Sequence, residues 1–135
     1  MKIVLELNEL VSVALSPRGK PADLLNLLFT GEIMVCVDDR ILAEYRGVLA
    51  RPAFGFNAAD VVNLAAYFGR FARRVNPKPL SIRLEDPDDI MFYEVLKASG
   101  ADYLVTGNLR HFKSIRDGRI VLPGVFGERY FSLHN

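Results

Sequence analysis

Cysteine is almost absent from this sequence, tryptophan is absent altogether, and no apolar stretch approaches the ~20 residues that a membrane-spanning helix requires. The single cysteine, Cys36, lies inside a short apolar run, so the chain can form neither a disulfide framework nor a thiolate cluster for zinc. We interpret Cys36 as a small buried hydrophobe. The sequence begins directly with a strand-like run rather than a targeting segment. We therefore expect a soluble, cytoplasmic protein that does not associate with membranes.

Charge of one sign is not in excess either. The 135 residues carry 17 basic and 16 acidic side chains, which gives a formal net charge of +1. This balance neither indicates nor excludes a polyanionic partner, because a local basic patch can coexist with a neutral total. The length is typical of one domain with a single core. We expect a single domain over residues 1–135.

Short apolar runs alternate with helical patterns along the chain. We predict strands at residues 2–7, 33–37, 103–106 and 120–122. We predict helices at 21–29, from Asp38 or Asp39 to 49, at 59–74 with Asn57 as a cap, and from Asp88 or Asp89 to 99, where Gly100 ends the helix. A glycine-rich tail is expected at 123–127. The alternation predicts an α/β fold with a parallel sheet covered by helices on both faces.

Glu6 lies inside a run that otherwise has the composition of a fully buried strand. An unpaired carboxylate withdrawn from water costs several kcal/mol, so Glu6 needs a cation, strong hydrogen-bond donors or a raised pKa. The alternative is that Glu6 lies at the exposed end of the strand and accepts hydrogen bonds from nearby backbone.

Three further acids have two possible explanations each. Glu44 falls at the border of the apolar stripe of its predicted helix, where an acid either points inward or is solvated. Asp88 and Asp89 precede a helix, where acids also complement the exposed backbone amides. Taken together with Asn108, which follows a strand, these acids form an oxygen-rich set that suits Mg²⁺ or Mn²⁺. Such ligands gather outside the carboxyl ends of parallel strands.

The order of these motifs resembles that of PIN-domain ribonucleases. The resemblance rests on Glu6-Leu7-Asn8, on Glu44 within the segment 41–52, on Asp86-Pro-Asp-Asp89, and on the segment 101–112, which contains Thr106-Gly-Asn108. It extends from residue 2 to about 126 and is strongest for the branch of toxins in toxin–antitoxin systems. The resemblance implies a three-layer α/β/α sandwich, an acidic cluster that binds Mg²⁺ or Mn²⁺, and metal-dependent cleavage of RNA.

The resemblance also implies a role for each motif residue. Glu6, Glu44 and Asp89 would be catalytic. The metal ligands would be Glu6 and Asp89, with Asp88 beside them, while Asn8, Thr106 and Asn108 would be supporting polar groups. The chain departs from the family pattern in its first strand. Glu6 stands where the family places Asp, and Leu7 stands where it places a small hydroxyl residue. A bound divalent ion in such a site neutralises charge on the scissile phosphate.

Basic residues should border the acidic pocket and receive the RNA backbone. The candidates are Arg18, Lys20, Arg110 and His111, although each is equally explained as an ordinary solvated side chain. We interpret a second basic group, Arg70, Arg73 and Arg74, as a solvated helix end. The resemblance further implies an antitoxin protein as partner and a homodimer, with the helical hairpin at 41–71 as the suspected interface.

Two other functions compete with a ribonuclease toxin. The first is a catalytically weakened PIN domain that serves as a binding module for nucleic acid or protein, which the Glu6-Leu7 pair favours. The second is a phosphoacceptor receiver domain, which also combines a parallel sheet with an acidic pocket. A receiver domain expects a lysine at the end of its fifth strand, whereas Thr106 leads here into Gly107-Asn108.

Overall fold

The computed structural model describes residues 1–16, 18–19, 23, 26–28 and 30–134, without the side chains of 131–134. The helix predicted at 21–29 lies mostly outside the described residues, as does Lys20. Within the described part, no helix has the length and apolar character needed to cross a membrane.

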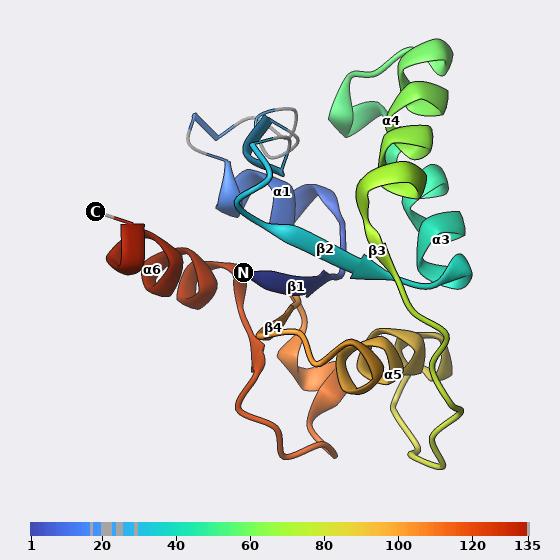
Figure 1. The fold of residues 1–135 in the computed structure, drawn as a ribbon, viewed down its shortest axis with the longest axis vertical. Helices are drawn as coiled ribbons and strands as arrows, with labels where there is room; N and C mark the ends of the chain where they lie inside the picture. The colour runs from blue at the N-terminus through green and yellow to red at the C-terminus, as the bar shows by residue number, and fades with distance from the viewer. Residues whose placement is uncertain (17, 20–22, 24–25, 29, 135) are drawn as a thin grey trace.

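The centre of the fold is a sheet of five parallel strands in the order β3-β2-β1-β4-β5 (Figure 1). The strands are β1 (Lys2–Leu5), β2 (Met34–Val37), β3 (Arg73–Arg74), β4 (Tyr103–Val105) and β5 (Ile120–Val121). Leu5 is in register with Val105, so the chain leaves β1 and β4 side by side at one edge. Four of the five strands were predicted to within three residues at either end. The parallel sheet and the α/β/α layering are confirmed.

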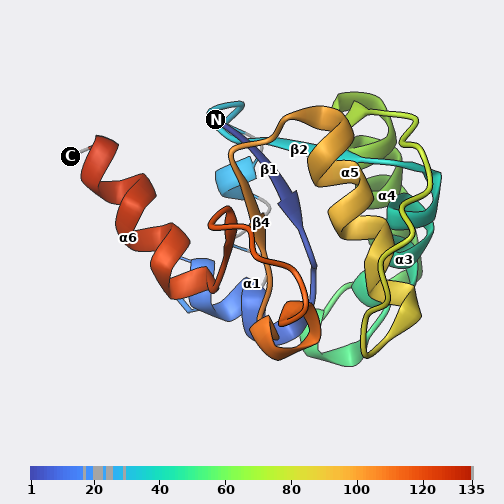
Figure 2. The same ribbon diagram turned by 90° about the horizontal axis from the view of Figure 1, so that it is seen from below.

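Helices cover this sheet on both sides. They are α1 (Glu9–Leu15), α3 (Asp39–Leu49), α4 (Ala58–Phe71), α5 (Ile90–Ser99) and α6 (Pro123–His134). Figure 1 shows α5 on one side of β1 and β2 and α1 on the other, while α3 and α4 form a hairpin beside the sheet. The C-terminal end of α6 projects away from the rest of the chain in both views (Figure 2).

The central strand β1 is buried from Ile3 to Leu5 because these three residues are apolar. Ile3, Val4 and Leu5 are almost completely shielded from water, and α5 packs over β1, β2 and β4. Full burial of an aliphatic side chain of this size contributes about 1.5–3 kcal/mol. The tight packing of these strands makes their carboxyl ends a rigid platform for the polar residues that follow.

Two predicted helix starts are confirmed by their caps. The Asp38 carboxylate accepts a hydrogen bond from the Ile41 N–H at 3.0 Å, and the Asn57 side chain accepts one from the Asp60 N–H at 2.9 Å. Gly100 ends α5 as predicted, with a left-handed φ of 64° that glycine adopts without strain.

Several predicted boundaries were wrong. The first strand ends at Leu5, and α1 follows it with Asn8 as its cap. The helix predicted at 59–74 ends at Phe71, because Arg73 and Arg74 pair with β2 as the edge strand β3. The two arginines therefore do not belong to a helix end. The tail expected at 123–127 is the start of α6, whose Phe126 stacks on Tyr130.

Candidate active site at the carboxyl edge of the sheet

Polar residues from four separate segments meet beyond the carboxyl ends of β1 and β4. Glu6 directly follows β1, and its N–H donates to the carbonyl oxygen of Val105 at 3.0 Å. Thr106 directly follows β4. Asp89 ends a short 3-10 turn, η2 (Pro87–Asp89), that leads into α5, and Glu44 lies in the middle of α3. Parallel pairing is thus the reason that residues about 100 positions apart lie together.

Glu6 is half-buried and is held by a hydroxyl group. The Thr106 hydroxyl donates to Glu6 Oε2 at 2.5 Å and accepts a hydrogen bond from the Asn108 N–H at 3.0 Å. Burial raises the pKa of Glu6, and the negative charge of Asp89 raises it further, against the lowering effect of the Thr106 hydrogen bond. Glu6 therefore pairs with a donor that fixes its orientation but does not neutralise its charge.

Asp89 is 7% exposed and contacts an imidazole. Its Oδ2 lies 2.8 Å from His111 Nδ1, and His111 Nε2 lies 3.0 Å from Asn108 Nδ2. Since the Asn108 amide nitrogen is a donor, this assignment makes Nε2 the acceptor and places the proton of a neutral ring on Nδ1. Burial and the charge of Asp86 raise the pKa of Asp89, and the contact with His111 offsets only part of that rise.

Glu44 is more exposed than the other two acids, but their charges raise its pKa. Partial burial raises its pKa first, and the charges of Glu6 and Asp89 raise it further, while Arg51 acts in the opposite direction. Arg51 itself is exposed and pairs with Glu9 at 3.2 Å. Glu44 therefore faces the same region as Glu6 and Asp89 from a third element of the fold.

The three carboxylates fit a divalent cation by their chemistry. They repel one another electrostatically, which is the cost that a bound cation removes, and carboxylate oxygens are the preferred ligands of Mg²⁺ and Mn²⁺. The residues that the structure describes contain no ready-made group of three or more His, Cys, Asp or Glu side chains that could hold a metal ion. The match to a divalent cation therefore rests on the type of these side chains and on their negative charge.

Of the other polar candidates, Asp88 lies near the acids and Asn8 caps a helix. Asp88 is exposed and adds to the negative charge that raises the pKa of Asp89 and Glu44. Asn8 caps α1, where its side-chain oxygen accepts a hydrogen bond from the Val11 N–H at 2.8 Å. Leu7, at the position of the missing hydroxyl, is a buried core residue. The hydroxyl that contacts the first-strand acid is supplied by Thr106 from the neighbouring strand.

Of the three basic candidates that the structure describes, His111 contacts one of the acids, whereas Arg18 pairs elsewhere. Arg18 pairs with Asp23 at 2.6 Å, in a separate pocket with Asn26 and Thr30. Arg110 is exposed on the short turn after Asn108. His111 lies at the site but faces Asp89 rather than open solvent.

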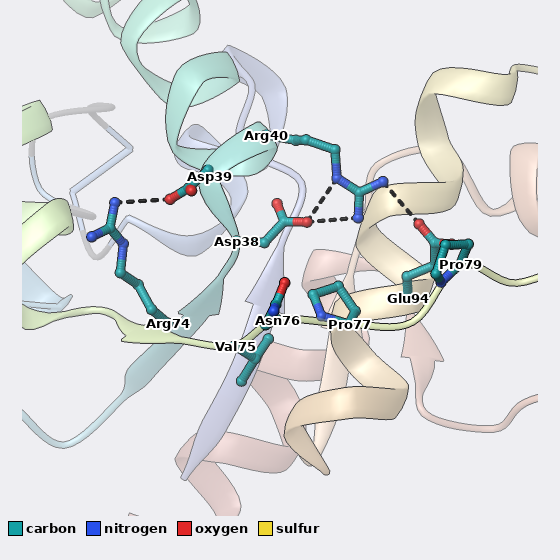
Figure 3. A pocket seen from close by; sticks show the side chains of 9 residues that line it. All are labelled: Asp38, Asp39, Arg40, Arg74, Val75, Asn76, Pro77, Pro79 and Glu94. Carbon is teal, nitrogen blue, oxygen red and sulfur yellow. Dashed lines mark hydrogen bonds and ion pairs between the residues drawn. The ribbon is translucent and has the colours of Figure 1, made fainter.

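The sequence interpretation missed two sets of site residues. The Asp86-Pro-Asp-Asp89 motif assigns Asp86 no role of its own, yet its charge raises the pKa of both Glu6 and Asp89. No sequence pattern indicates Arg40, although it forms ion pairs with Asp38 at 2.6 Å and with Glu94 at 2.9 Å. An open pocket of about 670 Å³ at the ends of β2 and β3 is lined by Arg40, Asp38 and Glu94, among others (Figure 3). Their sequence signal was weak, because Asp38 has a complete explanation as a helix cap.

Comparison with known proteins identifies the family. A family model described as a PIN domain matches residues 2–110, which is most of the chain and includes every acid described above. Neither the curated proteins nor the solved structures give a match. PIN domains are generally nucleases and typically use divalent metals. The matched range, the parallel sheet and the acids at its carboxyl edge agree with one another, and the chain belongs to the PIN-domain family.

Proposed function

We propose that this protein is a metal-dependent endoribonuclease and the toxin of a toxin–antitoxin pair. The observation that carries the proposal is the electrostatic coupling of Glu6, Glu44 and Asp89. Each of these acids has a raised pKa, and in each case part of the rise comes from neighbouring carboxylates. A site that keeps uncompensated negative charge at a sheet edge is suited to an external cation.

Glu6 and Asp89 would hold a divalent ion directly, with Glu44 completing the set. When bound, the ion would supply positive charge to the scissile phosphate. The protein's own residues orient the ligands. Thr106 holds one oxygen of Glu6 by a hydrogen bond, and His111 holds Oδ2 of Asp89. Asn108 supports both contacts, since its N–H donates to Thr106 and its side chain contacts His111.

The RNA would approach over the exposed turn that carries Arg110. An arginine there attracts the phosphate backbone toward an otherwise acidic site. The antitoxin partner and the homodimer are part of the same proposal and rest on the resemblance to the toxin branch. Exposed Val62 and Phe71 on α4 make the α3–α4 hairpin a surface to examine for the dimer contact.

The test is cleavage of RNA by the purified protein with Mn²⁺ and with EDTA. We expect endonucleolytic products that EDTA suppresses and that excess Mn²⁺ restores. Asp39→Asn is the matched control for removal of an acid of the site, and it should cleave RNA as the parent does. Asp39 is an exposed acid of the same helix as Glu44, and among the ion pairs of the described residues it pairs only with Arg74. Cleavage that persists in EDTA, or no cleavage of several RNAs by a folded protein, would contradict the proposal.

A second candidate is a weakened PIN domain that binds RNA or protein without cutting. Two observations favour it. Leu7 occupies the hydroxyl position, and the described residues contain no group of three or more His, Cys, Asp or Glu side chains placed to hold a metal ion. Saturable binding of RNA in EDTA, without any products in Mn²⁺, would support this reading over the nuclease.

A further inference from the structure

Arg40 joins the start of α3 to the middle of α5. Its Nε and Nη2 contact Oδ2 of Asp38 at 2.7 and 2.6 Å, and its Nη1 donates to Oε1 of Glu94 at 2.9 Å (Figure 3). Asp38 and Glu94 are both buried, whereas the Arg40 side chain is about half exposed. One guanidinium group therefore compensates two buried carboxylates on two different elements.

The two helices that Arg40 connects are the ones that position Glu44 and Asp89. Arg40 lies four residues before Glu44 in α3, hence on the same face and about 6 Å away along the axis. Asp89 immediately precedes α5, and Glu94 lies five residues after it. Arg40 therefore joins α3 to α5 through residues that lie four and five positions from the two catalytic candidates.

Glu94 also holds the segment that leads to Asp89. Its Oε2 accepts a hydrogen bond from the Leu80 N–H at 2.7 Å, and Leu80 lies in the extended connection between β3 and η2. The same carboxylate therefore fixes α3, α5 and the chain that enters the site. Removal of Arg40 would leave two buried carboxylates without their cation, which favours movement of these elements toward water.

We propose that Arg40 is a positioning residue that, through Glu94 and Asp38, fixes α3 against α5 and thereby the placement of Glu44 relative to Asp89, on which binding of a divalent cation depends. The inference rests on the proposed nuclease site and concerns how that site is held. Groups that hydrogen-bond directly to metal ligands alter metal affinity by about 10- to 100-fold when they are removed. Arg40 acts one contact further out, through the elements that carry the ligands, so we take the lower figure as the expected effect.

The test measures Mn²⁺ affinity by titration calorimetry in the absence of RNA. We expect Arg40→Met to weaken Mn²⁺ binding by about tenfold. We expect Arg40→Lys to fall between the parent and Arg40→Met, since lysine keeps the charge but lacks the planar fork that reaches two carboxylates. The matched control is Arg74→Met. Arg74 lines the same pocket and pairs with exposed Asp39, but it does not join α3 to α5, so its Mn²⁺ affinity should equal the parent's.

Loss of stability must be separated from loss of position. Val61→Ala trims a buried side chain of α4 away from the acids, and it should lower the melting temperature without changing Mn²⁺ affinity. If Arg40→Met does not fold, Glu94→Gln replaces it. This change removes the charge that Arg40 binds, keeps an oxygen for the Leu80 N–H, and should also weaken Mn²⁺ binding.

Two outcomes overturn the inference in distinguishable ways. If the parent binds Mn²⁺, Asp89→Asn abolishes that binding, and folded Arg40→Met and Glu94→Gln bind as the parent does, then the positioning role alone is wrong. If the parent itself does not bind Mn²⁺, the proposed metal site fails, and the positioning role fails with it.

Discussion

Two groups of acids lie along the same carboxyl edge of the sheet, and they differ in what balances them. Asp38 and Glu94, beyond β2 and on α5, are buried and share the guanidinium of Arg40. Among the described residues, the side chains that hydrogen-bond to Glu6 and Asp89, beyond β1 and before α5, are a hydroxyl group and an imidazole. The first group carries its cation within the fold, whereas the second leaves negative charge unmatched.

The difference indicates what each group contributes. Buried carboxylates that pair with an arginine of the same chain connect elements of the fold. Breaking such an ion pair destabilises the folded protein. Carboxylates that repel one another lower the free energy of unfolding. Such an arrangement is typical of functional sites, where an external ligand binds to the charges. The comparison therefore predicts opposite responses to removal of one acid from each group.

The largest expected effect is on metal binding and cleavage when Asp89 is replaced. Asp89→Asn keeps the shape of the side chain and its acceptor for His111 but removes a charge from the proposed ion site. We expect Mn²⁺ binding to be lost in calorimetry and RNA cleavage to become undetectable. Because the substitution relieves carboxylate repulsion, the metal-free variant should melt at or above the parent's temperature. A folded variant with the parent's Mn²⁺ affinity would remove Asp89 from the site.

Glu44 should show a smaller effect of the same kind. Glu44→Ala removes the acid that approaches from α3, and we expect Mn²⁺-dependent cleavage to fall at least about tenfold, the order of loss seen when a metal shell is disturbed. Its stability should change by less than ~0.5 kcal/mol, as at an ordinary exposed position. Arg46→Ala, an exposed change on the same helix, is the control. Equal cleavage by both variants would mean that Glu44 is only a solvated residue.

Removal of Glu94 should lower stability, in addition to the loss of Mn²⁺ affinity that the positioning role of Arg40 implies. Glu94→Ala leaves Arg40 without one partner and the Leu80 N–H without its acceptor. We expect a loss of about 2 kcal/mol in the free energy of unfolding by denaturant titration. This is less than the 3–5 kcal/mol of a fully buried pair, because water reaches the half-exposed Arg40. A loss no larger than that of metal-free Asp89→Asn would erase the contrast between the two groups of acids.

The sequence was sufficient for the parts of the fold that have a strong local pattern. The apolar runs of β1, β2 and β4 and the caps Asp38, Asn57 and Gly100 each predicted their elements. The two-residue strand β3 has no such pattern, because Arg73 and Arg74 become a strand only by pairing with β2. The helix α6 was missed because its glycines lower helix propensity, while packing of Phe126 and Tyr130 supplies the missing stability.

In the candidate site too, some residues could be predicted from the sequence and others could not. The order of the acids, through its resemblance to the PIN family, selected Glu6, Glu44 and Asp89 as candidates. That Glu6 and Thr106 lie together follows from the parallel pairing of β1 with β4. Arg40 could not be found in that manner, because its partner Glu94 is 54 residues away and the ion pair depends on how α3 meets α5. Placement of Arg18 beside Asp23 rather than beside the acids likewise depends on tertiary packing.

The smallest expected effect concerns a third acid that has its own cation, Asp117. Arg119 donates to it from the side chain at 2.7 Å, and this hydrogen bond, against the opposing effect of burial, lowers the pKa of Asp117 to about 2. The unfolded value is about 3.9, so the stabilising contribution is complete above that pH and is lost as the pH falls toward 2. We therefore expect Asp117→Asn to melt below the parent at pH 7 and the difference to shrink by pH 3. Glu85→Gln, at an exposed position, controls for the general effect of acid. A difference between Asp117→Asn and the parent that stays constant from pH 7 to pH 3 would show that Arg119 does not stabilise the charged form of Asp117.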